Sequence, residues 1–252
     1  MVFICKRKAL IASSLFIFVV SFFCILPTQA AGLDTDGDGL SDVDEARYGT
    51  DLTLPDTDFD GFTDGQEVSN GYSPKKSGNI LLKDNDEDGD LLNDALEIAF
   101  GTELAVRDTD GDHFSDYDEV MYGYSPTDPS SKARLTRKIV VDRTNQQLSL
   151  VVKNIPVMVV PVSTGVWGRE TPGGIFTIQK KIPVKRYVGP TYDYPNTKWN
   201  LQFKPQYYLH TAYWHDDFGI KTKSSGCENM READVEKLYK YMSVGVMVEV
   251  TG

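Results

Sequence analysis

Apolar residues follow three different patterns along this chain of 252 residues. Residues 9–26 form an almost unbroken apolar run, residues 31–128 carry apolar positions scattered among acidic ones, and the remainder has short apolar segments between turn residues. Short segments that alternate or run apolar between turns are typical of β-strands. We therefore predict strands at 139–141, 148–152, 157–162 and 246–250.

One stretch near the C-terminus has the spacing of a helix. Between residues 230 and 242, apolar side chains recur at intervals of three and four, at Val235, Leu238, Tyr239 and Met242. Such positions share one face of an α-helix. The C-terminal part is thus predicted to be mainly β, with one short helix.

The first apolar run is interpreted as an export signal. Lys6, Arg7 and Lys8 precede it, and the small residues Thr28 and Ala30 provide the −3 and −1 positions of a cleavage site after Ala30. We predict a signal peptide at 1–30 and an exported protein in the cell wall, in the periplasm or at the cell surface. An uncleaved anchor is the alternative, because about 18 apolar residues are just enough to span a bilayer.

Charge divides the rest of the chain in two. The formal net charge of −11 hides a net of −22 over residues 31–128 and a net of +8 over residues 129–252. A break of this kind indicates a domain boundary. We predict an acidic domain over 31–128, a linker over 129–136 and a basic domain over 137–252.

The acidic domain consists of a repeated motif. Four segments of twelve residues align without gaps, and each has Asp at positions 1, 3, 5 and 9 and Glu at position 12. We call them loops 1 to 4; they cover residues 34–45, 56–67, 86–97 and 108–119. Loops 3 and 4 begin 52 residues after loops 1 and 2, which indicates that a two-loop unit was duplicated.

This spacing is suited to calcium. Alternate carboxylates converge on one point of a tight loop, position 7 offers a backbone carbonyl, and Glu at position 12 closes the site, which together supply the six to eight oxygens that Ca²⁺ prefers. The predicted ligands are Asp34, Asp36, Asp38, Leu40, Asp42 and Glu45; Asp56, Asp58, Asp60, Phe62, Asp64 and Glu67; Asp86, Asp88, Asp90, Leu92, Asp94 and Glu97; and Asp108, Asp110, Asp112, Phe114, Asp116 and Glu119.

Two further positions of the loops carry expectations. Position 7 is apolar in every loop, so we predict that its side chain packs inward while its carbonyl faces the ion. Position 6 normally requires glycine for a sharp turn. Gly39 and Gly61 satisfy this, whereas Leu91 and His113 do not, so loops 3 and 4 are predicted to be weaker or differently turned.

The loops resemble the calcium-binding repeats of thrombospondin type 3 and related bacterial surface modules. The resemblance covers residues 34–128 and implies up to four structural Ca²⁺ ions, together with contacts to a cell-surface polymer or protein. The alternative is a disordered acidic stretch, which is the expected state without calcium because like charges repel.

Candidate chemistry in the basic domain centres on Cys227, the one cysteine outside the predicted signal. A thiol needs a base to become a nucleophile, and acyl transfer needs backbone N–H groups for the oxyanion. His210, at a predicted strand end, and His215 are the available bases. Ser225 and Gly226 form a turn of small residues before the predicted helix. The backbone N–H groups of this turn are expected to point into a cleft near the positive end of the helix.

Each of these residues also has a structural interpretation. Cys227 alone is more often a packed thiol, and His215 is more often a surface or packing residue. Asn229 and Glu232 have the Asn-x-x-Glu spacing of a helix cap.

The basic domain nevertheless resembles the L,D-transpeptidase catalytic family (YkuD-like), bacterial enzymes that remodel peptidoglycan. The family signature of His followed by Ser/Thr-His-Gly-Cys-apolar-Asn/Arg appears as His210 followed by Ser224-Ser225-Gly226-Cys227-Glu228-Asn229. Upstream, 162–165 and 171–178 are similar to the family's Ser-Thr-Gly and Thr-Pro-x-Gly-x-Phe-x-Ile stretch. The likeness spans 137–252 and implies a β-sandwich with a short helix after the cysteine.

The resemblance also implies roles. Cys227 is the nucleophile, His210 its base, Gly226 and the Cys227 N–H line the oxyanion hole, and Asn229 lies near the site. The implied reaction is attack on a tetrapeptide stem of peptidoglycan, release of D-Ala, and transfer of the thioester to an amine or to water. No catalytic cofactor and no nucleic-acid partner is implied.

Two residues depart from the signature. Ser225 replaces the family's His, and Glu228 replaces an apolar residue and is expected to raise the pKa of the thiol. His215 is a candidate replacement for the lost imidazole. The alternatives to an active enzyme are therefore a catalytically impaired wall-binding protein and a calcium-dependent adhesion or spacer module.

Overall fold

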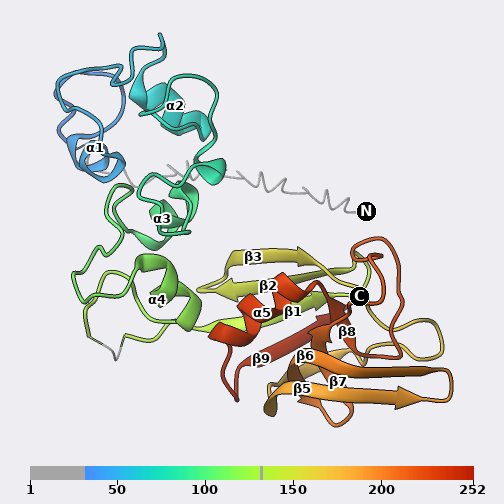
Figure 1. Cartoon of the computed structure of the whole chain (residues 1–252). Coiled ribbons are helices and arrows are strands. Elements are labelled where there is room, and N and C mark those ends of the chain that lie inside the picture. The colour runs from blue at the N-terminus through green and yellow to red at the C-terminus, as the bar shows by residue number, and fades with distance from the viewer. Residues whose placement is uncertain (1–31, 131–132) are drawn as a thin grey trace, which may run out of the picture.

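A computed structural model describes residues 32–130 and 133–252 (Figure 1). The predicted signal peptide at 1–30 and its two cysteines lie outside the described residues. Across the described part of the chain, no helix combines the length and the apolar character needed to cross a membrane.

The acidic domain is a series of loops, each followed by a seven-residue helix. These helices are α1 (Asp42–Tyr48), α2 (Asp64–Asn70), α3 (Asp94–Phe100) and α4 (Asp116–Tyr122), with a 3₁₀ helix η1 (Leu82–Asp84) between α2 and α3. Each α-helix begins after a side-chain N-cap, at Ser41, Thr63, Asn93 or Ser115, and ends at a glycine in the left-handed conformation. Local capping therefore fixes both ends of helices too short to be stable alone.

The basic domain contains two packed β-sheets. The first has the order β3-β2-β1-β9-β4, and the second has the order β5-β6-β7-β8. Their bounds are β1 Arg137–Asp142, β2 Gln147–Val152, β3 Ile155–Pro161, β4 Gly174–Thr177, β5 Lys180–Gly189, β6 Tyr192–Lys204, β7 Tyr207–Thr211, β8 Glu228–Met230 and β9 Met247–Thr251. Helix α5 (Glu232–Tyr241) packs against β6 and β7.

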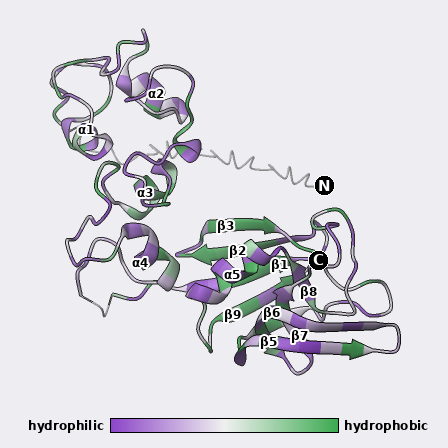
Figure 2. Cartoon of the chain, viewed as in Figure 1, coloured by the Kyte–Doolittle hydropathy of each residue, from purple (hydrophilic) through white to green (hydrophobic). Residues whose placement is uncertain are grey.

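One hydrophobic core joins the two sheets. Ile139 and Leu150 from the first sheet are fully buried, as are Leu201, Phe203 and Leu209 from the second. Figure 2 shows the contrast between the hydrophobic strands β1, β2 and β3 and the hydrophilic helix α2. Burial of apolar surface thus stabilises the basic domain, whereas the acidic domain has a small separate cluster of Leu40, Tyr48, Leu82 and Leu104.

The expected mainly β fold is confirmed, as are the predicted strands that correspond to β1, β2, β3 and β9. The hairpin β5–β6 was not predicted. Its residues are mostly part-exposed, and Pro183 and Pro195 interrupt the strand pattern. Proline removes a ladder hydrogen bond, which weakens a sequence-based strand assignment.

The predicted helix exists, but its position relative to the cysteine differs from the expectation. Strand β8 lies between Cys227 and α5, so the Cys227 N–H does not lie at a helix N-terminus. The predicted cap is also wrong: Asn229 belongs to β8, and the N-cap residue of α5 is Arg231, which makes no side-chain cap hydrogen bond.

The last acidic loop packs directly against the basic domain. Val120 and Met121 of α4 are buried in the same core as the sheets. Arg137 Nη1 donates to the carbonyl oxygens of Met121 at 2.7 Å and of Tyr241 at 2.9 Å, which links α4, β1 and α5. Residues 133–135 of the segment predicted as a linker hydrogen-bond back to residues 123–125.

Candidate functional site

The loop before β8 presents the cysteine. Gly226 has φ of 111°, and a Cβ at this position would lie 2.7 Å from the ring of Tyr207, so the turn requires glycine. The Ser224 hydroxyl donates to the carbonyl of Cys227 and accepts the Gly226 N–H at 3.0 Å. The Gly226 N–H, expected to face an acyl oxygen, is therefore occupied in this conformation, and Cys227 as a whole residue is half-buried.

His210 lies on β7, which is adjacent to β8, the strand that follows Cys227. Strands β7 and β8 pair in parallel, with His210 opposite Asn229. His210 Nδ1 lies 2.8 Å from the carbonyl oxygen of Thr211. Because a carbonyl only accepts, Nδ1 carries the proton, and Nε2 is left as the basic nitrogen of the neutral ring.

Burial shifts the titration of both groups toward their neutral forms. It lowers the pKa of His210 to about 4, with a smaller contribution from nearby Lys185. It raises the pKa of the Cys227 thiol to about 12, with a smaller contribution from Glu228. At neutral pH the site therefore holds a thiol and a neutral imidazole, not a thiolate–imidazolium pair.

Glu228 was expected to place an anion beside the thiol. It is fully buried, and burial raises its own pKa to about 8. Glu228 is therefore largely protonated at neutral pH. It then raises the pKa of the Cys227 thiol less than a fully ionised carboxylate would.

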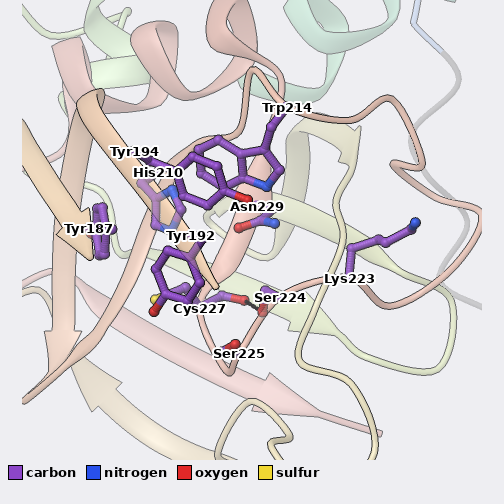
Figure 3. Close-up of a pocket in the computed structure, with 10 residues that line it drawn as sticks. All are labelled: Tyr187, Tyr192, Tyr194, His210, Trp214, Lys223, Ser224, Ser225, Cys227 and Asn229. Atoms are coloured by element: carbon purple, nitrogen blue, oxygen red, sulfur yellow. Dashed lines mark hydrogen bonds between the residues drawn. The ribbon is translucent and has the colours of Figure 1, made fainter. Parts of the chain in front are cut away.

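Five cleft residues were missed by the sequence analysis. Tyr187, Tyr192, Tyr194, Trp214 and Lys223 line the cleft together with His210, Ser224, Ser225, Cys227 and Asn229 (Figure 3). The Tyr194 and Trp214 rings are stacked at 3.7 Å between centroids, and Tyr192 stacks on Tyr194 at 5.3 Å. The aromatic residues concentrated in 192–194 and 213–214 are the sequence feature that could have indicated these cleft walls.

The loop that carries His215 folds back onto the site. The His215 ring packs against Phe218, and its Nε2 lies 2.9 Å from the side-chain amide of Asn229. His215 is thus in contact with a cleft residue. Ser225, which stands where the resemblance expected a histidine, is exposed and accepts a hydrogen bond from Arg169 Nη1 at 2.9 Å.

The four acidic loops share one geometry. In each loop the carboxylates at positions 1, 3 and 5 place ligand atoms within 4.8 Å of one another. Among the described residues, the position-3 aspartates and the position-12 glutamates retain buried oxygens without a hydrogen-bond partner. Burial and neighbouring aspartates raise the pKa of Glu45 and Glu67 to about 7, of Glu119 to about 8 and of Glu97 to about 9. Unpaired buried carboxylates are costly, and the oxygen-only donor set fits Ca²⁺.

The aspartates at position 9 have a different role in this structure. Both carboxylate oxygens of Asp42, Asp64, Asp94 and Asp116 accept hydrogen bonds from residues near the start of the same loop. These side chains hold the loop closed and are not part of the convergent group at positions 1, 3 and 5.

Two expectations about the loops are corrected. Leu40 and Leu92 at position 7 are buried as predicted and belong to the two hydrophobic clusters, whereas Phe62 and Phe114 are 54% and 58% exposed and belong to neither cluster. Leu91 and His113 adopt φ of 90° and 83°, close to the 99° and 100° of Gly39 and Gly61. Loops 3 and 4 are therefore turned in the same way as loops 1 and 2.

The comparisons with known proteins fall on the same two regions. Residues 136–250 match the model of the L,D-transpeptidase catalytic domain (YkuD). Residues 34–51, 56–71 and 108–130 match the bacterial TSP3 repeat. Loop 3 lies outside the matched residues, although its geometry is that of the other loops. No curated protein matches the chain.

Several solved structures are similar to the basic domain. An L,D-transpeptidase from Mycobacterium smegmatis is 22% identical, with a TM-score of 0.45 over 47% of this chain and 60% of that one. One from Stackebrandtia nassauensis is 26% identical, with a TM-score of 0.41 over 46% and 56%. The catalytic domain of the E. faecium L,D-transpeptidase is 20% identical, with a TM-score of 0.42 over 46% and 96%. The chain spans about 60% of the length of the mycobacterial structures it matches.

Proposed function

Since residues 136–250 form an L,D-transpeptidase catalytic domain that follows bacterial TSP3 repeats, we propose that this protein is an exported L,D-transpeptidase acting on the stem peptides of peptidoglycan. The observation that carries the proposal is the parallel pairing of His210 with Asn229, immediately after the loop that presents Cys227. This pairing supports a single cleft that contains a thiol, a base and a polar amide.

The first half-reaction forms a thioester. Cys227 Sγ attacks the carbonyl carbon of the peptide bond after the third residue of a tetrapeptide stem. His210 Nε2 accepts the thiol proton during the attack. Transfer of this proton before the attack is unfavourable, because the thiol has a pKa of about 12 and the imidazole a pKa of about 4. The same proton then passes to the leaving amine of D-Ala as the C–N bond breaks.

The second half-reaction releases the enzyme. An amine of a neighbouring stem attacks the thioester and gives a cross-link, or water attacks and gives a shortened stem. In both cases His210 Nε2 takes the proton of the attacking group and returns it to Cys227 Sγ. The Cys227 N–H stabilises the oxyanion, whereas Ser225 and Gly226 shape the turn that aims it.

The acidic loops are proposed to hold up to four structural Ca²⁺ ions, with no part in the chemistry. In each loop the carboxylates at positions 1, 3 and 5, the carbonyl at position 7 and the glutamate at position 12 would hold the ion. Calcium supplies the positive charge that the buried oxygens of Glu45 and Glu97 lack among the described residues. The repeats are proposed to contact a wall polymer or a surface protein, and export rests on the signal predicted at 1–30.

A second candidate is a wall-binding protein that holds stem peptides in the same cleft without turnover. It is favoured by the raised pKa of the Cys227 thiol and by the Gly226 N–H, which is occupied by Ser224.

Product analysis distinguishes the two. The full exported chain is incubated with tetrapeptide muropeptides in calcium, and D-Ala and cross-linked or shortened products are measured by mass spectrometry. The enzyme releases D-Ala, and Cys227→Ala does not. Binding of the stems without release, at equal strength in Cys227→Ala, would favour the wall-binding protein. A folded chain that neither binds nor processes stems would reject both.

A further inference from the structure

His215 has defined contacts at both ring nitrogens. Nδ1 accepts the backbone N–H of Asp217 at 3.2 Å. Nε2 lies 2.9 Å from the side-chain amide of Asn229. The first contact fixes the tautomer, because a backbone N–H only donates and Nδ1 must therefore be unprotonated. In the neutral ring the proton is then on Nε2.

The tautomer of His215 fixes the orientation of the Asn229 amide. A protonated Nε2 requires an acceptor, and the acceptor of an asparagine side chain is its oxygen. The oxygen and nitrogen of an amide are nearly identical in shape, and their assignment follows from the hydrogen-bond network. The amide atom placed 2.9 Å from Nε2 is Nδ2, so this network requires the two amide atoms to be exchanged. Asn229 then presents Oδ1 to His215, and its NH₂ group is directed away from that ring.

The backbone of Asn229 is anchored by two hydrogen bonds, and its side chain lines the same cleft as Cys227. The Asn229 N–H and carbonyl both bond Ser163 at 2.9 Å, and the side chain is only 2% exposed. Cys227 lies in the bend directly before β8, and Asn229 is the second residue of that strand. Asn229 and Cys227 both line the cleft (Figure 3).

We propose that His215 is a positioning residue, which holds the Asn229 amide with its NH₂ group toward Cys227 so that Asn229 donates a hydrogen bond to the acyl oxygen during thioester formation. The inference rests on the proposed function and names one further donor of that site. The charged groups near the His215 ring are Asp216, Asp217 and Lys223. Asp217 is paired with Lys221 and Lys223, and burial lowers the pKa of the His215 ring despite Asp216 and Asp217, so the ring is neutral at neutral pH.

The test compares two reactions of the same thiol in the full chain. His215→Phe keeps a ring against Phe218 but loses the hydrogen bond, and His215→Gln restores a donor at the place of Nε2. Acylation of Cys227 by a tetrapeptide stem needs a donor to the oxyanion, whereas alkylation by iodoacetamide does not. Asp216→Asn, an exposed neighbour, is the control.

We expect His215→Phe to acylate about 10- to 100-fold more slowly, with the loss in kcat and little change in KM, and His215→Gln to recover most of the rate. Alkylation is expected to match the wild type in all three variants. Equal acylation in His215→Phe, or an equal fall in both reactions, would overturn the proposal.

Nitrogen-15 spectra provide a readout that needs no turnover. The His215 ring is expected to show the Nε2–H tautomer in wild type and in Asp216→Asn. The Asn229 NH₂ signals should be unchanged in His215→Gln and shifted in His215→Phe. An Nδ1–H tautomer would contradict the proposed amide orientation. A wild type that is never acylated but shows the Nε2–H tautomer would overturn the proposed function and the donor role while leaving the positioning intact.

Discussion

The hydroxyl of Tyr241 donates a hydrogen bond to the carboxylate of Asp118, and this contact joins the last acidic loop to the last helix of the catalytic domain. Asp118 belongs to α4, next to the proposed calcium ligand Glu119, and Tyr241 ends α5. Lys240 also reaches Asp118, and the rings of Tyr117 and Tyr122 pack edge-on against Tyr241. Order in loop 4 is thereby linked to α5.

This link predicts that calcium stabilises the catalytic domain as well as the repeats. In the full chain, adding calcium should raise the unfolding temperature of the β domain, followed by near-ultraviolet circular dichroism. Tyr241→Phe should lower the free energy of unfolding in calcium by about 1–2 kcal/mol, because the hydroxyl that bonds Asp118 and Lys240 is lost. Tyr239→Phe on the same helix is the matched control. A β domain whose unfolding ignores calcium would show that the two parts are independent.

The pKa values of Cys227 and His210 predict an unusual pH profile for thiol modification. A thiol with a raised pKa and an imidazole with a lowered pKa are both neutral near pH 7. The rate of alkylation of Cys227 by iodoacetamide should therefore keep rising from pH 7 to pH 10, since the reactive thiolate forms only as the pH approaches the thiol pKa. Glu228→Gln should shift the profile to lower pH, because it removes a negative charge near the thiolate. A rate that levels off below pH 8 would indicate a thiolate–imidazolium pair instead.

The strained turn of loop 3 predicts a stabilising substitution. Leu91 has φ of 90° and is 67% exposed. Its left-handed conformation destabilises the loop, and little burial of the side chain offsets this effect. Leu91→Gly should raise the free energy of unfolding in calcium by about 1 kcal/mol. The reverse change in loop 1, Gly39→Leu, should lower it by a similar amount. Urea unfolding of the full chain measures both, and destabilisation by Leu91→Gly would mean that its side chain contributes packing.

The loops are expected to bind calcium in two coupled pairs. Asp38 Oδ2 accepts the N–H of Gly65 in loop 2, and Asp90 Oδ2 accepts the N–H of Tyr117 in loop 4, both at a separation of 27 residues. An ion that fixes Asp38 therefore also orders the start of α2. Glu45→Gln in loop 1 should remove one site and weaken loop 2 by about 5-fold, as measured by calcium titration calorimetry. Loops 3 and 4 should bind as before, and an unchanged affinity of loop 2 would show that the loops act singly.

The acidic loops could be predicted closely because most of their contacts are local. Asp34 and Glu45 belong to one loop–helix unit, so their spacing in the sequence already describes the site. The errors arose where a residue depends on distant neighbours. Phe62 and Phe114 carry the same apolar signal as Leu40 and Leu92, yet neither ring belongs to a hydrophobic cluster of the described residues.

The residues proposed as nucleophile and base of the candidate cleft could be selected from the sequence, but the walls of the cleft could not. Cys227 and His210 stand in a recognisable signature, whereas Tyr187, Tyr192 and Tyr194 come from the β5–β6 hairpin, whose strands the sequence did not reveal. The cap assigned to Asn229 failed for a related reason. Its side chain contacts His215, which is 14 residues away and is brought there only by the fold of the intervening loop.

Covalent capture of the thiol tests the central claim most directly. The chain without the predicted signal peptide (residues 31–252) is mixed with a tetrapeptide stem in calcium and quenched in acid. Its mass is then measured by intact-protein mass spectrometry, followed by peptide mapping. We expect an added mass of the stem minus D-Ala on the peptide that contains Cys227, slower formation in His210→Ala, and none in Cys227→Ser. A folded wild-type chain that processes the stem with no acyl adduct, or with the adduct at another residue, would contradict Cys227 as the nucleophile.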